Sequence, residues 1–245
     1  MQGVDWLINL IFIILTYLPH LNSIFSVDCV IFAFDEGELK ILLIERNQDP
    51  YKDWFALPGN MVNNDESIDA AAERVLYELT GLKDIYMEQF HTFGELNRHP
   101  KGRIITVAYF AMIRLNSAKD VRPVIPYAKN ASWVSIKELP ELGFDHKMIF
   151  EKGFERVKSK ISYQPLAFEL LPEKFTLTQL QNLYELILNK KLDKRNFRKK
   201  ILAYDILKEL DEKQKGVSYR AAKLYKFDRR KYSKYFQNEL SFSKD

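Results

Sequence analysis

The chain has 245 residues, which favours one large or two modest domains, and its 47% hydrophobic and 29% charged residues argue against a fibrous or disordered protein. The single cysteine, Cys29, excludes a disulfide framework within the chain and indicates a reducing, cytoplasmic compartment. The net charge of +4 is uneven, because Ile187–Tyr235 holds 17 Lys or Arg against 6 Asp or Glu, a local +11 that leaves −7 on the remainder. We interpret the basic end as a module that docks on a polyanion, although a merely solvated basic surface would have the same composition.

The chain opens with an apolar run, Trp6–Leu18, that is 13 residues long. A membrane span needs about 20 such residues, and a secretory signal needs a basic start and a small-residue cleavage site, which are not found here. We therefore interpret residues 1–25 as a hydrophobic extension that packs on the fold or on a partner. A membrane anchor is the less favoured alternative.

From Ser26 onward the pattern indicates β-structure. Val27–Phe34 and Leu39–Glu45 are apolar runs rich in β-formers, and the turn residues Asp35–Glu38 between them predict a hairpin. Asp49–Asn64 contains Pro and Gly breakers and is expected to be a loop.

A helix is expected next, capped by Asp65 or Ser67 and followed by Gly81, because apolar residues recur at helical spacing between these points. The other elements expected in this half are a strand at Arg103–Arg114, a short strand at Trp133–Val134 and a helix at Phe144–Ser159. This order predicts a mixed α/β sandwich with a helix on each side of a sheet.

The pattern changes after Tyr163–Pro172, which has the composition of a linker. The elements expected beyond it are a helix from a Thr176 or Thr178 cap to Leu188, a basic helix from an Asp193 cap to about Asp205, and strands at Ile206–Leu210 and Ala222–Phe227 around a polar loop. Helix, tight turn, basic helix and hairpin is the plan of a winged helix-turn-helix.

The segment Leu57–Leu82 resembles the box of the Nudix family, whose pattern is G-x5-E-x7-R-E-U-x-E-E-x-G-U, with U a bulky aliphatic residue. Glu66 takes the position of the first glutamate and Arg74 that of the arginine, while Asn60 replaces the first glycine. The resemblance implies that this half of the chain is a Nudix α/β/α sandwich.

Three further box positions are catalytic carboxylates in that family, and here they are Val75, Glu78 and Leu79. Magnesium takes hard oxygen ligands in tight octahedral geometry, and hydrocarbon cannot replace them. We therefore expect no catalytic residue, no metal and no cofactor, with Glu66, Arg74 and Glu78 as remnants of the box. Arg74 and Glu78 are spaced to form an ion pair on the helix.

A disabled enzyme site can still bind a ligand. The stretch Asn97–Arg103 resembles the Arg-Asp-Pro-x-Gly-Arg segment of Nudix proteins that handle ADP-ribose, and Trp54 precedes the box where a ring could stack on it. The candidates for ligand contact are Trp54, Arg98, His99 and Arg103. The alternative for the charged residues is a solvated loop.

On the basic helix, Phe197, Ile201 and Tyr204 are spaced to face the core. Arg195, Arg198 and Lys199 then point away together, as a helix that reads the major groove requires. The candidates for DNA contact are Lys194, Arg195, Asn196, Arg198 and Lys199 on this helix and Lys213, Lys215 and Arg220 in the hairpin loop.

The span Val27–Tyr232 as a whole resembles the Nudix-related transcriptional regulators, which join a Nudix-like effector domain to a C-terminal winged helix. Phe175–Gln181 and Leu192–Lys200 look like signatures of the C-terminal domain. One branch of the family senses ADP-ribose and another L-arabinose, and Asp28–Phe32 and Arg74–Leu82 look closer to the arabinose branch. The resemblance implies a homodimer that releases double-stranded operator DNA when its effector binds.

We therefore expect an effector-binding domain at 26–160, a DNA-binding winged helix at 161–245, and a regulator, with repression favoured. We expect its effector to be a sugar or nucleotide-sugar, with L-arabinose favoured over an ADP-ribose-like molecule. One rival is a Nudix hydrolase with a basic appendage, which would turn over ADP-ribose with Mg²⁺. Another is a sugar-binding adaptor that does not bind DNA. The operator sequence, the effector and the sign of regulation are left open by the sequence.

Overall fold

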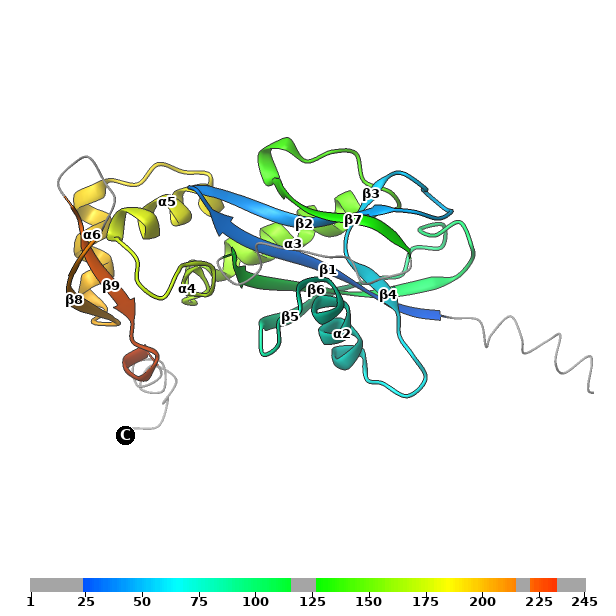
Figure 1. The fold of residues 1–245 in the computed structure, drawn as a ribbon, viewed down its shortest axis with the longest axis horizontal. Coiled ribbons are helices and arrows are strands. Elements are labelled where there is room, and N and C mark those ends of the chain that lie inside the picture. The colour runs from blue at the N-terminus through cyan, green and yellow to red at the C-terminus, as the bar shows by residue number, and fades with distance from the viewer. Residues whose placement is uncertain (1–23, 116–126, 215–220, 233–245) are drawn as a thin grey trace, which may run out of the picture.

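The computed structural model describes residues 24–115, 127–214 and 221–232 (Figure 1). The first part of the chain forms β1 (Ile24–Asp35), β2 (Glu38–Arg46), β3 (Phe55–Ala56), β4 (Gly59–Met61), α2 (Ile68–Thr80), β5 (Tyr86–Phe93), β6 (Ile104–Arg114), β7 (Ala128–Ser135), the short 3-10 helix η2 (Ile136–Glu138) and α3 (His146–Lys160). The second part forms α4 (Ala167–Leu170), α5 (Leu177–Leu188), α6 (Lys194–Ala203), β8 (Leu207–Lys213) and β9 (Lys223–Phe227).

Seven strands of the described residues form one mixed sheet in the order β3-β2-β1-β6-β5, with β4 paired to β1 and β7 paired to β2. The central strand β1 runs parallel to β6 and antiparallel to β2, which confirms the predicted hairpin. Its successive side chains alternate between the two faces: Val30 and Phe32 enter one apolar core, and Cys29 and Ile31 enter the other. A strand covered on both faces has such a continuous apolar sequence.

Helix α2 covers one face of the sheet. The Ser67 hydroxyl accepts a hydrogen bond from the Ala70 N–H and so caps the helix, which decides between the two predicted caps. Gly81 ends it with φ 67°, a left-handed conformation that glycine adopts without steric cost. Val75 and Leu79 are buried in the core beneath the helix.

Helix α3 covers the opposite face, so the predicted sandwich with a helix on each side is confirmed (Figure 1). The predicted start at Phe144 was two residues early. Phe144 has φ 58°, outside the right-handed helical region, and the helix begins at His146 after Asp145 in the capping position.

Four strands depart from the sequence expectation. β7 covers Ala128–Ser135, whereas only Trp133–Val134 was predicted. β3 and β4 lie within the segment predicted as loop, where they are only two and three residues long. β5 was not predicted, because it lies partly exposed at the edge of the sheet and a bulge between Gln89 and His91 interrupts its alternation.

The C-terminal part is the predicted winged helix. Thr176 caps α5 in a reciprocal capping box with Gln179, and Asp193 caps α6 by accepting from the Asn196 N–H at 2.8 Å. Phe175 and Tyr225 exchange two backbone hydrogen bonds, an isolated β-bridge that ties the segment before α5 to β9. The segment predicted as a linker contains the short helix α4.

One apolar core joins the two parts. The cluster beneath α3 includes Val30, Ile149 and Val157 of the sandwich together with Leu180 and Ile201 of the winged helix. The cluster beneath α2 contains described residues of the sandwich alone. The winged helix is therefore packed against the sandwich through the α3 side of the sheet.

No helix within the described ranges is long and apolar enough to cross a bilayer. The apolar run Trp6–Leu18 lies outside these ranges, and only residues 24–25 of the expected N-terminal extension are described, where they begin β1.

Candidate functional site

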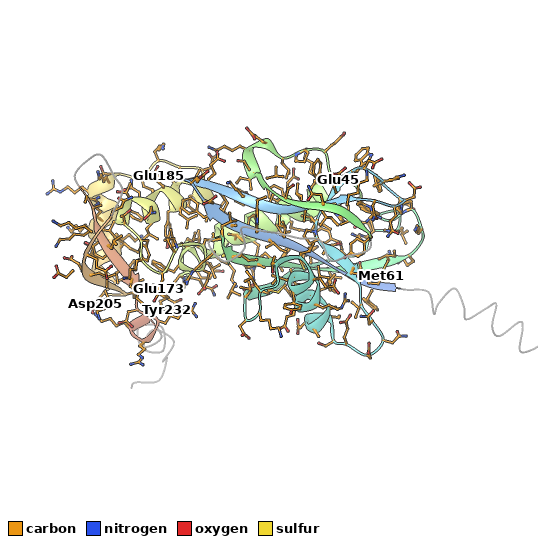
Figure 2. The ribbon with its side chains drawn as sticks, viewed as in Figure 1. Glu45, Met61, Glu173, Glu185, Asp205 and Tyr232 are labelled. Atoms are coloured by element: carbon orange, nitrogen blue, oxygen red, sulfur yellow. The ribbon has the colours of Figure 1, made fainter. Side chains whose placement is uncertain are left out.

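A pocket of about 220 Å³ opens on the sandwich, lined from β1, β2, β4, the loop before β6 and the segment just before α3. Met61 is one of the residues that line this pocket. In Figure 2 Met61 lies toward one end of the sheet, and the winged helix, on which Glu185 and Tyr232 are labelled, lies beyond the other end. The pocket and the winged helix thus lie at opposite ends of the molecule.

The floor of the pocket is a buried cluster of charged side chains. Both guanidinium edge nitrogens of Arg98 donate to the Asp145 carboxylate, at 2.9 and 2.7 Å, and one of them lies 3.5 Å from an oxygen of Asp28. The Arg98 side chain is only 4% exposed. Because buried charges are stable only when paired, these two carboxylates hold the guanidinium in place.

His146 completes the floor. Its Nδ1 accepts a hydrogen bond from the Leu57 N–H at 2.8 Å, so the ring proton lies on Nε2, which faces the Asp28 carboxylate at 3.5 Å. Burial lowers the pKa of His146, which keeps the imidazole neutral near neutral pH. Gly59 lies so close that a Cβ there would stand 2.2 Å from an oxygen of Asp28.

One wall of the pocket is aromatic and basic. The ring of Phe144 stacks on His99 with centroids 5.0 Å apart and 13° between planes, and the Arg46 guanidinium lies 4.9 Å from the Phe144 centroid. Tyr51 packs on the same ring at 4.6 Å. Burial, with Arg98 and Lys101 nearby, lowers the pKa of His99.

The remnants of the Nudix-like box form a structural ion pair. Arg74 donates to both oxygens of Glu66, at 2.9 and 2.6 Å, and lies 3.4 Å from Glu78. The hydrogen bonds from Arg74 hold the pKa of Glu66 down at about 2.

A Mg²⁺ ion does not fit this set of residues. Val75 and Leu79 are 0% and 1% exposed and belong to the apolar core, so hydrocarbon stands where two of the box carboxylates would be. Among the described residues, no group of three or more His, Cys, Asp or Glu is arranged to hold a metal.

Two of the four residues predicted to contact a ligand lie in the pocket, and the other two do not. Arg98 and His99 line the pocket, whereas Trp54 and Arg103 do not. Trp54 is 41% exposed and packs edge-on against Tyr51, and Arg103 donates to the Gly94 carbonyl.

Sequence reasoning did not single out several residues of the pocket. They are Asp28, Arg46, Phe144 and His146, together with Asp145, which does not line the pocket but pairs with Arg98 in its floor. Asp28 gave a usable signal, because a lone carboxylate inside an apolar strand needs a partner when it is buried.

Helix α6 presents a basic face. Arg195 and Lys199 are exposed with Lys194 and Asn196, while Ile201 is buried and Phe197 packs on Tyr184 at 5.6 Å. Arg198 is half-buried, so it is less exposed than Arg195 and Lys199, and its buried Nε has no hydrogen-bond partner within the described ranges. One expectation needs correction. Tyr204 is 38% exposed rather than in the core, because the helix ends at Ala203.

The turn before α6 is held by one carboxylate. Glu185 accepts from the Gln181 amide at 2.9 Å and from the Leu192 N–H at 3.0 Å, and Lys191 pairs with it. The Gln181 hydrogen bond is the largest cause that lowers the pKa of Glu185 to about 2. These contacts fix the direction in which α6 leaves α5.

The hairpin carries one described candidate for DNA contact. Lys213 ends β8 and is exposed, opposite Lys223 on β9. Lys215 and Arg220 lie outside the described residues.

Comparison with known proteins matches both parts of the chain. Residues 24–152 match the model of the NUDIX domain, and residues 167–227 match that of the NrtR DNA-binding winged helix domain. The chain is 36% identical over 225 residues to the ADPR responsive transcriptional repressor NtrR of Acinetobacter baylyi, which covers 90% of this chain and 88% of that protein. It is 32% identical over 146 residues to the ADP-ribose pyrophosphatase of Methanocaldococcus jannaschii, covering 58% of this chain and 79% of that one.

Two solved structures of Shewanella oneidensis NrtR are similar. The complex with a 27mer DNA superposes with a TM-score of 0.75 at 29% identity, over 85% of this chain and 95% of that one. The NUDIX domain complexed with ADP ribose gives a TM-score of 0.51 at 29% identity, over 64% of this chain and 99% of that one.

Proposed function

We propose that this chain, which belongs to the family of regulators that join a Nudix domain to an NrtR winged helix, is a transcriptional repressor that releases double-stranded operator DNA when ADP-ribose, or a close analogue of it, binds the pocket. The observation that carries the proposal is a pocket with a charged floor and an aromatic, basic wall, without the box carboxylates, on a domain that shares its core with a winged helix.

The chemistry of the pocket suits a nucleoside diphosphate linked to a sugar. Arg46 and Lys101 supply positive charge for a diphosphate, and Asp28 supplies an acceptor for sugar hydroxyls. Tyr127 and the stacked pair of Phe144 and His99 supply aromatic surface beside a base.

Arabinose, the effector favoured from sequence, has neither a charge nor an aromatic ring to use these groups. The matching relatives carry ADP-ribose in their names, so arabinose finds no support there.

A second candidate, hydrolysis of ADP-ribose, is favoured by the likeness to the Methanocaldococcus pyrophosphatase. We propose that it is absent here, because Val75 and Leu79 leave Glu78 as the one acidic residue among those three box positions. Purified protein with ADP-ribose and Mg²⁺ should release no product. Turnover on the order of 1 s⁻¹ that Glu78→Gln abolishes would establish the hydrolase instead.

We further propose that the protein works in the cytoplasm as a homodimer, because two copies of α6 would then read two half-sites about one helical turn apart. Light scattering on the purified chain, with and without DNA, measures the oligomeric state. A monomer on a single half-site would contradict this part of the proposal.

The repressor proposal is tested by fluorescence anisotropy of a labelled duplex that the full chain selects from a randomised pool. Retention on that duplex at low salt, with release on adding ADP-ribose but not on adding arabinose, is the expected result. A protein that selects no duplex would be the adaptor considered above. Release of the duplex by arabinose but not by ADP-ribose would show that arabinose is the effector.

A further inference from the structure

Helix α3 connects the pocket to the winged helix. Its first residue, His146, lines the pocket, and Ile161, directly after its last residue, lines a second cavity of about 300 Å³ together with Tyr184 of α5 and Ile201 of α6. At 1.5 Å per residue, its 15 residues span about 22 Å. A displacement at one end of α3 therefore reaches the other end directly.

The helix is seated closely on the sheet. A Cβ on Gly153 would lie 3.1 Å from the ring of Phe90 and 3.2 Å from a methyl group of Val30, so the helix backbone approaches these side chains with no space to spare. Because a closely packed interior transmits strain rather than absorbing it, α3 is expected to move as a unit by small sliding shifts.

The far end of α3 is tied to the edge strand β5. The buried Lys160 forms an ion pair with Glu88, and the Tyr86 hydroxyl donates to Glu88 at 2.8 Å. Arg156, one turn earlier on the helix, lies 3.4 Å from the same carboxylate. The end that faces the winged helix thus has its own anchor.

The near end of α3 lacks the cap that its sequence offers. Asp145 occupies the N-cap position, yet its side chain caps no helix N–H, because both of its oxygens accept from Arg98. The arginine of the pocket floor and the start of α3 therefore compete for one carboxylate.

We propose that Asp145 is the positioning residue that couples the pocket to the winged helix. An anionic effector group takes the hydrogen bonds of Arg98, Asp145 is released to cap α3, and α3 shifts against α5 and α6. A ligand changes a conformational equilibrium only through contacts that differ between the two states, and the exchange of the partner of Arg98 is such a difference. This inference rests on the proposed function.

The test measures two quantities on the full chain: the affinity for ADP-ribose by calorimetry, and the factor by which ADP-ribose weakens binding to the selected duplex. That factor is typically about 5- to 150-fold in coupled proteins. Asp145→Asn keeps the shape and the capping ability but no longer competes strongly for Arg98. We expect it to bind ADP-ribose more tightly and to reduce the factor to below about 2-fold. If Asp145 had only a structural role, the substitution would weaken both the binding of ADP-ribose and its effect on DNA binding.

A second variant addresses the other end of the helix. Glu88→Gln loosens the Lys160 anchor at the end of α3 opposite the pocket, so it should leave ADP-ribose affinity unchanged while reducing the factor by which ADP-ribose weakens DNA binding. If Asp145→Asn does not fold, as judged by circular dichroism, Glu88→Gln carries the test alone. Lys147→Ala, an exposed change beside Asp145, is the matched control and should behave as the unmodified protein.

The two proposals fail in different ways. If ADP-ribose does not weaken DNA binding by the unmodified chain, the proposed function is wrong. If it does, and both Asp145→Asn and Glu88→Gln keep the unmodified factor, coupling through α3 is overturned.

Discussion

Helices α2 and α3 cover opposite faces of one sheet, but their surroundings differ. The core beneath α3 continues into the winged helix, whereas the core beneath α2 stays, within the described ranges, inside the sandwich. The box with its lost carboxylates is on α2, and two residues that line the pocket, Phe144 and His146, lie at the start of α3. The face that carries the box is thus separate from the face whose core continues into the winged helix.

The largest expected effect tests whether the α3 core is shared. Leu180→Ala on α5 removes a fully buried side chain and should lower the free energy of unfolding by about 2–5 kcal/mol. The three tryptophans, Trp6, Trp54 and Trp133, all precede the winged helix in the chain. If the core is one cooperative unit, their fluorescence midpoint in denaturant must shift although the substitution is on α5.

The matched control is Leu76→Ala on α2, which removes a leucine buried in the other core. Its fluorescence midpoint shows how large the shift is when the sandwich itself is destabilised. A fluorescence midpoint that stays in place for Leu180→Ala, while the helical circular dichroism signal shifts, would show that the two parts unfold separately.

The next effect concerns the ion pair at the α2 face. Arg74 depresses the pKa of Glu66 to about 2 from an ordinary 4.5, so the pair stabilises the fold fully above about pH 4.5 and loses this contribution as the pH falls toward 2. Glu66→Gln should lower the free energy of unfolding near neutral pH by about 1.5–3 kcal/mol, with the difference vanishing in acid. Denaturant titrations at several pH values measure it.

The same variant sharpens the comparison of the two faces. Since α2 has no described core contact with the winged helix, DNA affinity should not change in Glu66→Gln. A change in DNA affinity at a pH where the variant is folded would mean that the α2 face also communicates with the winged helix.

A smaller effect is expected on the surface of α6. Arg195→Ala removes an exposed guanidinium from the basic face and should cost about 1–3 kcal/mol of DNA binding while relaxing sequence preference. Its unfolding midpoint should equal that of the unmodified chain, because the side chain is outside the shared core. Lys83→Ala, an exposed lysine on the sandwich, serves as the control, and equal losses in both variants would show a nonspecific charge effect.

The smallest effect belongs to the hairpin. Lys213→Ala should weaken binding to all duplexes alike and reduce the slope of log affinity against log salt by about 0.9, the value for one phosphate contact. Anisotropy titrations over a range of salt concentrations measure this slope. An unchanged slope would place the hairpin away from the DNA backbone.

Local chemistry in the sequence was sufficient for much of the fold. Helical spacing predicted α2, and Asp193 was named as a cap because capping depends on residues three positions apart. The other two caps were each narrowed to a pair of residues, from which the structure selects Ser67 and Thr176. The box spacing likewise identified Val75 and Leu79 as hydrocarbon at carboxylate positions. Patterns of this kind can be recognised in a single sequence because the interacting residues lie within a few helical turns of each other.

The pocket depended on contacts that no local pattern encodes. Arg98 was predicted to contact a ligand and does line the pocket, but its two carboxylate partners were not predicted: Asp145 lies 47 residues later and Asp28 lies 70 residues earlier. His146 meets Leu57 across 89 residues, and Phe144 takes a left-handed conformation that a helical pattern cannot show. Periodicity reports which side of an element is apolar, but which charged groups share one buried site follows from how the sheet brings distant loops together, and that is decided by tertiary packing.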